Sequence, residues 1–163
     1  MKITVIGEFC TDIFVYGETK RLSPEAPVPV LTPVETVCTD GMASNVVRNI
    51  EAIGYNGTVN ITYYTQDALL TKTRFVEKKS NHMFFRLDEG ENQPIDQFNF
   101  DDVKGEHFDI VIVSDYDKGY LSNRDITRLG NLGEISILDS KRRLTHDMID
   151  SYTWVKLNKK EAD

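Results

Sequence analysis

Apolar residues occur along the chain in short runs, separated by polar stretches that contain glycine, asparagine or aspartate. Runs of about four to eight β-branched and aromatic residues are typical of buried strands. We therefore expect buried strands at 2–7, 58–64, 109–115, 134–139 and 153–157. The run at 109–115 (DIVIVSD) is the clearest of them.

Two intervening stretches show helical spacing instead. The stretch 43–54 has one apolar face and should end at Gly54, because glycine commonly terminates helices. That face consists of Val46, Val47, Ile50 and Ile53. The stretch 122–133 predicts a short helix capped by Ser122 or Asn123. Strands that alternate with helices predict an α/β fold with a mostly parallel sheet.

A second group of segments alternates apolar and polar side chains, as half-exposed strands do. The segments 12–22 and 28–38 follow this pattern, and 72–79 and 82–89 predict a hairpin around Ser80 and Asn81. Between the first two lies RLSPEAPVPVL, with three prolines within six residues. Since proline cannot donate to a sheet ladder, we expect 28–38 to be an edge strand.

The composition is that of a globular protein: the 163 residues are 40% hydrophobic and 28% charged, with a net charge of −7. This acidity argues against nucleic acid or an acidic membrane as partner. The two isolated cysteines and the lack of a signal-peptide or membrane-spanning run predict a cytoplasmic protein. The three histidines form no ligand pattern. Basic clusters in TKTR, SKRR and KLNKK are either small phosphate sites or solvated surface.

Polar side chains follow four of the predicted parallel strands. They are Glu8 and Asp12, Asp115 and Lys118, Asp139 and Lys141, and Asn158 and Glu161. Ligands of open α/β sheets bind beyond the carboxyl ends of the strands. We therefore expect a binding face at that edge.

The order of these motifs resembles that of the ribokinase-like (PfkB) carbohydrate kinases, and most closely their heptose-phosphate kinase branch. The segment GEFCTDIFVYGETKRLSPEAPVPVL is similar to that branch almost residue for residue. Further similar motifs follow in the same order: GMASNVVRNIEAIG, TKTRF, FFRLDE, VSDYDKGYLS, LDSK and NKKE. Together they extend over nearly the whole chain.

The resemblance implies a single ribokinase-like α/β domain, here truncated, with a small β-sheet lid built from 12–38 and 72–88. Such a lid covers the sugar and often pairs with a second subunit, which would explain the rigid proline-rich strip. The activity implied is ATP- and Mg²⁺-dependent phosphoryl transfer to a sugar hydroxyl. The lid also presents an apolar surface that predicts a homodimer or a complex with a related kinase. The residues of this surface are Phe14, Tyr16, Val28, Val30, Phe84 and Phe85.

The resemblance also assigns roles to single residues. Asp12, Gly41 and Asn45 match the sugar-binding positions, and a carboxylate suits a pair of hydroxyls. The candidates for holding the substrate phosphate are Lys72, Arg74 and Arg86, and arginine would hold it bidentately. Lys118 and Lys141 would lie near the transferring phosphates, and Asn158 and Glu161 match a motif that organises magnesium, with Glu161 as the metal-side residue.

The chain departs from the family pattern in several places. Met42 replaces a glycine that allows close approach to the sugar, Glu8 replaces an aspartate, and Ser140 replaces a proline. Only residues 65–68 connect two segments that are normally separated by a further helix and strand. The Gly-Ala-Gly-Asp segment that supplies the catalytic aspartate does not occur in the 163 residues.

Three hypotheses follow. The chain is a sugar-phosphate kinase, or its sugar-binding half completed by another polypeptide; or it is a non-catalytic module that binds a sugar phosphate or a kinase subunit; or it is a remnant that dimerises. With no matching catalytic base, we expect negligible ATP consumption by these residues alone. Asp115 and Asp139 are the first candidates for a substitute base.

Overall fold

A computed structural model describes residues 1–53 and 59–159. The chain forms two compact units, each assembled from non-contiguous segments. The first unit comprises 1–9, 42–68 and 93–163, and the second comprises 10–41 and 69–92. Within the described residues, no helix is both long and apolar enough to cross a bilayer.

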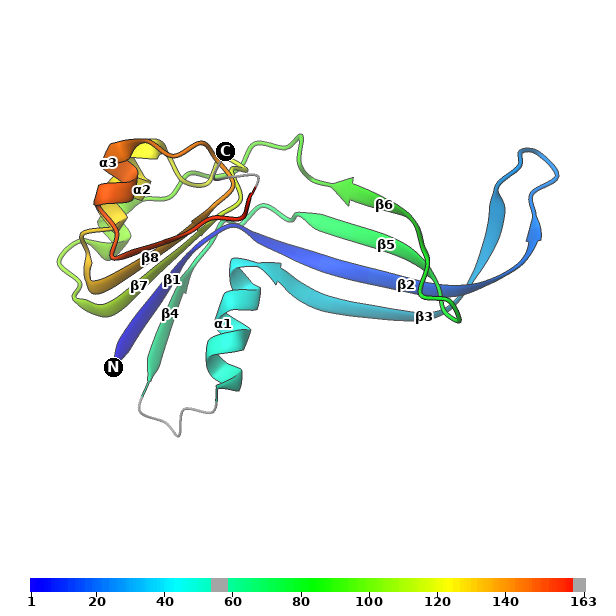
Figure 1. Ribbon diagram of the computed structural model, residues 1–163, viewed down its shortest axis with the longest axis horizontal. Coiled ribbons are helices and arrows are strands. Elements are labelled where there is room, and N and C mark those ends of the chain that lie inside the picture. The colour runs from blue at the N-terminus through cyan, green and yellow to red at the C-terminus, as the bar shows by residue number, and fades with distance from the viewer. Residues whose placement is uncertain (54–58, 160–163) are drawn as a thin grey trace. The chain divides into compact units, whose positions relative to one another are not determined.

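The first unit is built on a five-stranded sheet (Figure 1). Its strands, in the order β4-β1-β7-β8-β9, are β4 (Asn60–Tyr64), β1 (Lys2–Gly7), β7 (Phe108–Asp115), β8 (Gly133–Ser140) and β9 (Trp154–Lys156). Every neighbouring pair in this sheet is parallel. The α/β class and all five predicted strands are therefore confirmed, and the carboxyl ends of these strands share one edge.

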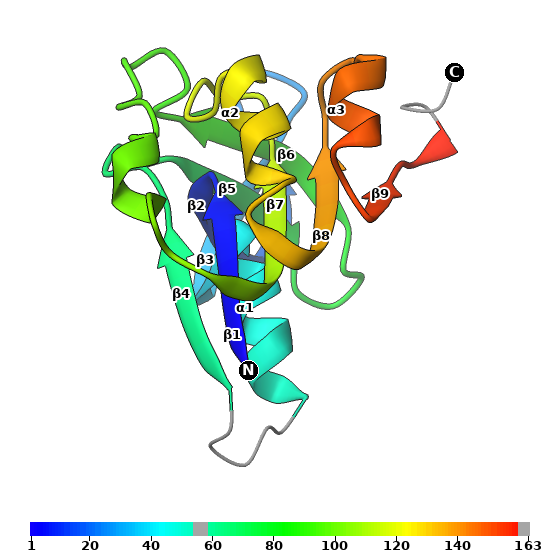
Figure 2. The ribbon, with the colours of Figure 1, turned by 90° about the vertical axis from the view of Figure 1, so that its left-hand side faces the viewer.

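Helices lie on both faces of this sheet (Figure 2). α1 (Ala43–Ala52) contacts β1, β4 and β7, while α2 (Asn123–Leu129) packs on β7 and on α3 (His146–Asp150). A short 3-10 helix spans Phe100–Val103. Ser122 caps α2 through a reciprocal pair of hydrogen bonds with Asp125, which confirms one of the two predicted caps. α3 was not expected from the sequence, because five residues are too few to show a helical period.

The core of the first unit lies on the α2 and α3 side of the sheet. It includes Val111 and Val113 of β7, Leu138 of β8, Ile126 of α2 and Met148 of α3, all at most 1% exposed. Burying such aliphatic side chains contributes about 1.5–3 kcal/mol each, so this face provides much of the unit's stability.

α1 differs from its prediction in two respects. The helix ends at Ala52, and the predicted stop at Gly54 lies outside the described residues. The face expected to be buried is only partly so, because Ile53 is 72% exposed. The buried residues of the helix are instead Ala43 and Ser44, at its start. The first turn of α1 therefore makes the main contact with the sheet.

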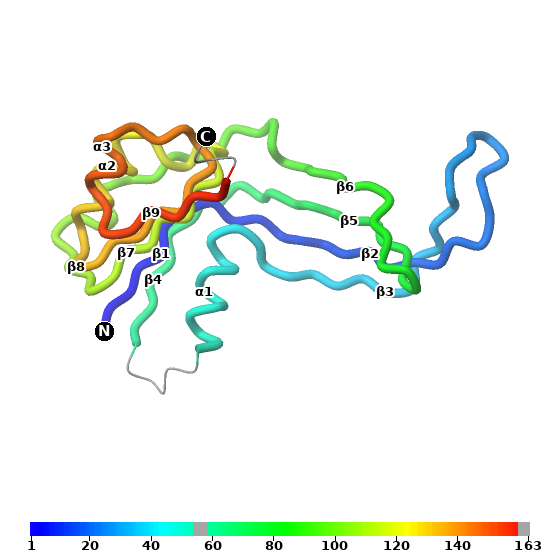
Figure 3. The backbone as a smooth tube through the Cα atoms, viewed as in Figure 1, coloured from blue at the N-terminus to red at the C-terminus, as the bar shows by residue number. Residues whose placement is uncertain are grey.

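The second unit is a four-stranded sheet with the order β3-β2-β5-β6 (Figure 3). Its strands are β3 (Pro29–Met42), β2 (Phe9–Leu22), β5 (Thr71–Glu77) and β6 (Met83–Glu89). β2 pairs with β5 in parallel, and β5 and β6 form the predicted antiparallel hairpin. The proline-containing β3 is an edge strand, as predicted.

We predict that Gly7→Ala lowers the free energy of unfolding by at least about 3 kcal/mol, because the added methyl group overpacks the sheet. Gly7 is paired with Ser114 of β7, and a Cβ at Gly7 would lie 2.0 Å from the Ser114 carbonyl oxygen. Gly105→Ala is the control, since a Cβ there meets no atom within 4 Å and only the left-handed φ of 78° opposes it. Urea denaturation should show a loss of about 1–2 kcal/mol for this control. Equal losses in the two variants would contradict the argument.

Candidate functional site

Charged side chains gather on one face of the sheet in the second unit. The strand register places Asp12, Lys72 and Asp88 side by side across β2, β5 and β6. In the adjacent row, Arg74 lies between Phe14 on β2 and Arg86 on β6. Because residues two apart on a strand share a face, both rows lie on the same side of the sheet. The register thus brings together the four lid residues predicted to bind the substrate.

The two arginines are directly opposite each other, an arrangement that like charges disfavour. Each is turned toward a carboxylate. Arg74 donates to Asp12 at 2.6 Å and stacks on the ring of Phe14, 5.0 Å from its centroid. Arg86 donates to both oxygens of Asp88, at 2.7 and 2.9 Å. The hydrogen bonds to Asp88, followed by its charge, raise the pKa of Arg86, so this guanidinium is always charged.

Gly41 lies directly against the acidic residue of this face. A Cβ at Gly41 would be 2.4 Å from Asp12 Oδ2 and 2.7 Å from the sulfur of Cys10. Glycine, which has no Cβ, therefore leaves the space at this position that the Asp12 carboxylate occupies. Burial, and then the negative charge of Asp12, raise the pKa of the Cys10 thiol to about 11, so Cys10 is a neutral thiol at physiological pH.

At the carboxyl edge of the first unit, Glu8 is completely buried rather than offered to a ligand. Its carboxylate accepts hydrogen bonds from the backbone N–H groups of Tyr116, at 2.7 Å, and Lys118, at 3.1 Å. Burial raises the pKa of Glu8, partly offset by these hydrogen bonds. The polar residue predicted here for a binding face instead fixes the backbone of the loop that carries Lys118.

Asp115, at the end of β7, is also fully buried. Arg142 donates to both of its oxygens, each at 2.7 Å, and the Ser140 hydroxyl donates to the same carboxylate. Arg142 belongs to the SKRR cluster, for which phosphate binding and solvated surface were the two alternatives, yet its side chain is only 11% exposed. Asp115 is fully paired and is therefore not a substitute catalytic base. Ser140, the departure from proline, forms part of the same network.

An open pocket of about 480 Å³ lies on the α1 side of the first sheet. The polar groups that line it are Asn45, Asn49, Ser114, Tyr116, Asp139 and Lys156. Asp139 pairs with Lys156 at 2.7 Å and lies 3.9 Å from the ammonium of Lys141. Of the predicted residues, Asn45 and Lys141 are thus associated with this pocket. Lys156 of the KLNKK cluster, for which a phosphate site was one of the two alternatives, lines it as well. Two cations beside one carboxylate favour the binding of an anionic ligand such as a phosphate group. They do not favour a role for Asp139 as a general base.

The predicted magnesium-side residues are only partly described. Asn158 is exposed and follows β9, while Glu161 lies outside the described residues. Among the described residues of the pocket, Asp139 is the single carboxylate, and a lysine already holds it. This pairing does not fit a magnesium ligand set, so we assign no ion to the pocket.

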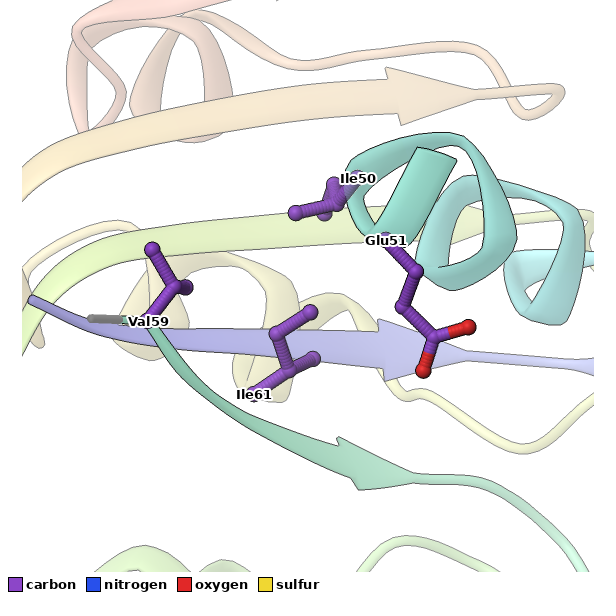
Figure 4. Close-up of a pocket in the computed structure, with 4 residues that line it drawn as sticks. All are labelled: Ile50, Glu51, Val59 and Ile61. Atoms are coloured by element: carbon purple, nitrogen blue, oxygen red, sulfur yellow. The ribbon is translucent and has the colours of Figure 1, made fainter. Parts of the chain in front are cut away.

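Two further features lie away from the predicted residues. A pocket between α1 and β4 is lined by Ile50, Glu51, Val59 and Ile61 (Figure 4), none of which was expected to bind a ligand. His107, Asp109 and Glu134, at the amino ends of β7 and β8, have ligand atoms within 4.8 Å of one another. This grouping differs from the expectation that no histidine forms a ligand pattern, but its side chains are accessible and we assign no metal to it.

Met42, at the start of α1, shows the physical reason for a glycine at this position. Its φ of 56° and ψ of −132° fall in a region that residues with side chains rarely adopt, yet the side chain is only 5% exposed. Such backbone conformations cost about 1–3 kcal/mol, and the burial of the methionine side chain offsets that cost.

The fold of the chain is that of the ribokinase-like carbohydrate kinases. Phosphofructokinase-2 from Escherichia coli in complex with potassium superposes with a TM-score of 0.59 at 16% identity, over 98% of this chain and 60% of that enzyme. Ribokinase from Arabidopsis thaliana, complexed with ribose and ATP, gives a TM-score of 0.55 at 11% identity, over 94% of this chain and 58% of that enzyme. No protein-family model matches the chain.

Sequence comparison identifies the relatives more closely as the HldE bifunctional proteins. The chain is 28% identical to Bifunctional protein HldE of Desulfatibacillum aliphaticivorans over 99% of its length, which covers 40% of that protein. It is 32% identical to HldE of Rhodopseudomonas palustris (strain BisA53) over 85% of its length, covering 36% of that relative. The chain therefore spans at most about two fifths of the length of these relatives. The resemblance to carbohydrate kinases predicted from the sequence is confirmed.

We predict that Arg142→Met lowers the free energy of unfolding by about 3–5 kcal/mol, because it leaves the buried Asp115 carboxylate without its partner. The neighbouring Lys141→Met should cost less than about 1 kcal/mol, since the ion pair of Lys141 with Asp139 is long, at 3.9 Å, and its side chain is 37% exposed. Adding Asp115→Asn to Arg142→Met should restore part of the loss. Urea denaturation of the four proteins measures these differences, and an Arg142→Met variant as stable as the wild type would refute the role assigned to the pair.

Proposed function

We propose that the chain binds a phosphorylated sugar, of the heptose-phosphate type, as the sugar-binding part of an ATP-dependent sugar-phosphate kinase. The observation that supports this most directly is the charged face of the second unit. Asp12 offers a carboxylate for hydroxyl groups, while Lys72, Arg74 and Arg86 offer cationic donors within the same two rows of the sheet. A sugar phosphate requires this combination of an acceptor for the ring and donors for the phosphate.

The relatives and the fold support the same class of activity. The nucleotide phosphates would then lie at the carboxyl edge of the first unit, near Lys118, Lys141 and Lys156. We place the kinase in the cytoplasm, since Cys10 and Cys38 are both free thiols.

A non-catalytic interaction module is the second candidate, and the opposite face of the same sheet favours it. There Phe75 stacks on Phe85, with ring centroids 4.5 Å apart, and Phe85 is 56% exposed. Together with Pro29, Leu31, Pro33 and Phe84, these rings line an apolar groove of about 250 Å³. An exposed apolar groove of this kind is characteristic of a protein–protein contact. Phe14 and Tyr16, predicted for the same surface, instead stack on each other, and Phe14 lies on the charged face.

We predict that Arg86→Ala weakens the binding of a sugar phosphate at least tenfold, about 1.4 kcal/mol, and leaves binding of the unphosphorylated sugar unchanged. Asp12→Ala should weaken both ligands, because its carboxylate is assigned to the hydroxyl groups. Calorimetric titration measures these effects, with a heptose phosphate, hexose phosphates, pentose phosphates and the corresponding free sugars as ligands.

Arg21→Ala is the matched control, because Arg21 is an exposed arginine near the end of β2. It should bind every ligand as the wild type does. Absence of binding of any sugar phosphate at millimolar concentration would exclude the proposed substrate class and leave the interaction module as the better description.

We predict that the chain forms a homodimer through the apolar face of the second unit. Sedimentation velocity at micromolar concentration should show a dimer, and Phe85→Asp should convert it to a monomer by placing a charge in the groove. Ile53→Asp is the control, since Ile53 is an exposed aliphatic residue of the first unit. A wild-type protein that sediments as a monomer at tens of micromolar would exclude this interface.

A further inference from the structure

Arg86 donates to Asp88, a residue of the same FFRLDE motif to which the sequence analysis assigned no role. Its Nε and Nη2 groups each donate to a different oxygen of Asp88, at 2.7 and 2.9 Å. Two parallel hydrogen bonds from one edge of a guanidinium are also the geometry by which arginine binds a phosphate group. Asp88 therefore occupies the edge of Arg86 that is best shaped for the substrate phosphate.

A phosphate has two ways to reach this arginine, and Asp88 opposes both. It can displace the carboxylate from the Nε edge and replace one pair of charge-assisted hydrogen bonds by another. Alternatively it can bind at the opposite edge, where the carboxylate remains close and repels it. In neither case does the phosphate gain the full strength of a bidentate contact.

The charge of the whole face leads to the same conclusion. Three cations, Lys72, Arg74 and Arg86, face the carboxylates of Asp12 and Asp88, which leaves a formal charge of +1 on the two rows. A phosphate monoester carries about −1.5 to −2 at neutral pH and so exceeds this charge. Removing the charge of Asp88 would raise the face to +2 and match a dianion.

Building on the proposed function, we propose that Asp88 is an intramolecular competitor for the phosphate and sets the affinity of the site. The competition weakens every phosphate ligand. Inorganic phosphate, which has no further contacts to offer, then binds too weakly to occupy the face. A sugar phosphate retains useful affinity because its hydroxyl groups also bind, so Asp88 makes occupancy depend on the sugar.

The test uses Asp88→Asn, which keeps the size and polarity of the side chain and removes its charge. Calorimetric titration with inorganic phosphate at constant ionic strength should show binding at least fivefold tighter than to the wild type. Glu89→Gln is the matched control: it removes one negative charge from the adjacent residue of β6, whose side chain points to the other face. Its phosphate affinity should stay within twofold of the wild type. Asp88→Ser replaces the Asn variant if thermal melting shows that variant to be unfolded.

Weaker phosphate binding by Asp88→Asn would overturn the inference, because Asp88 would then position Arg86 rather than compete for it. Equal tightening in Asp88→Asn and Glu89→Gln would also overturn it, by showing a general charge effect. If sugar-phosphate binding requires Arg86 but is unchanged in Asp88→Asn, the competition proposed for Asp88 is excluded and the proposed function is retained. If neither inorganic phosphate nor a sugar phosphate binds either protein at millimolar concentration, both proposals fail.

Discussion

The buried contact between Asp115 and Arg142 is the interaction on which the carboxyl edge of the first sheet depends. An ionised carboxylate without exposure to water is tolerated only where donors surround it, and Arg142 and Ser140 provide them. Arg142 also donates to the Leu121 carbonyl and to Asn123, so one guanidinium joins the loops after β7 and β8 to the start of α2. Asp115, a candidate substitute base in the sequence, thus fixes the loops at this edge instead.

The second sheet has a different constraint, because many side chains of its strands are only half-buried. Alternation along the strands places the paired charges, together with the stacked rings of Phe14 and Tyr16, on one face and the Phe75–Phe85 pair on the other. The charged face has nearly balanced ion pairs, which keeps the opposed arginines stable in the absence of a ligand. The price of that stability is that any anion must compete with carboxylates already in place.

Much of the fold could be predicted from the sequence, because buried strands appear as apolar runs and half-exposed strands as alternation. The edge position of β3 followed from its prolines, and the cap of α2 from Ser122. The features that could not be predicted depend on contacts between residues that are far apart in the chain. Nothing local shows that Arg142 turns inward to Asp115, or that Glu8 is buried beneath a loop 108 residues later. Asp88 was within reach, since it lies two residues after Arg86 and therefore on the same face.

The interleaving of the two units has a consequence for how the protein reaches its native state. Asp12 meets Arg74 across 62 residues of chain, and those residues include α1 and β4 of the other unit. Neither unit is therefore a continuous segment that can be excised, and the second sheet cannot be completed before α1 and β4 of the first unit have been synthesised. Parallel pairing at such separations makes chain entropy the main barrier, so folding should be slow and governed by topology. Until β5 has been synthesised, β2 lacks its partner on one side, while the prolines of β3 disfavour pairing of the opposite edge with another chain.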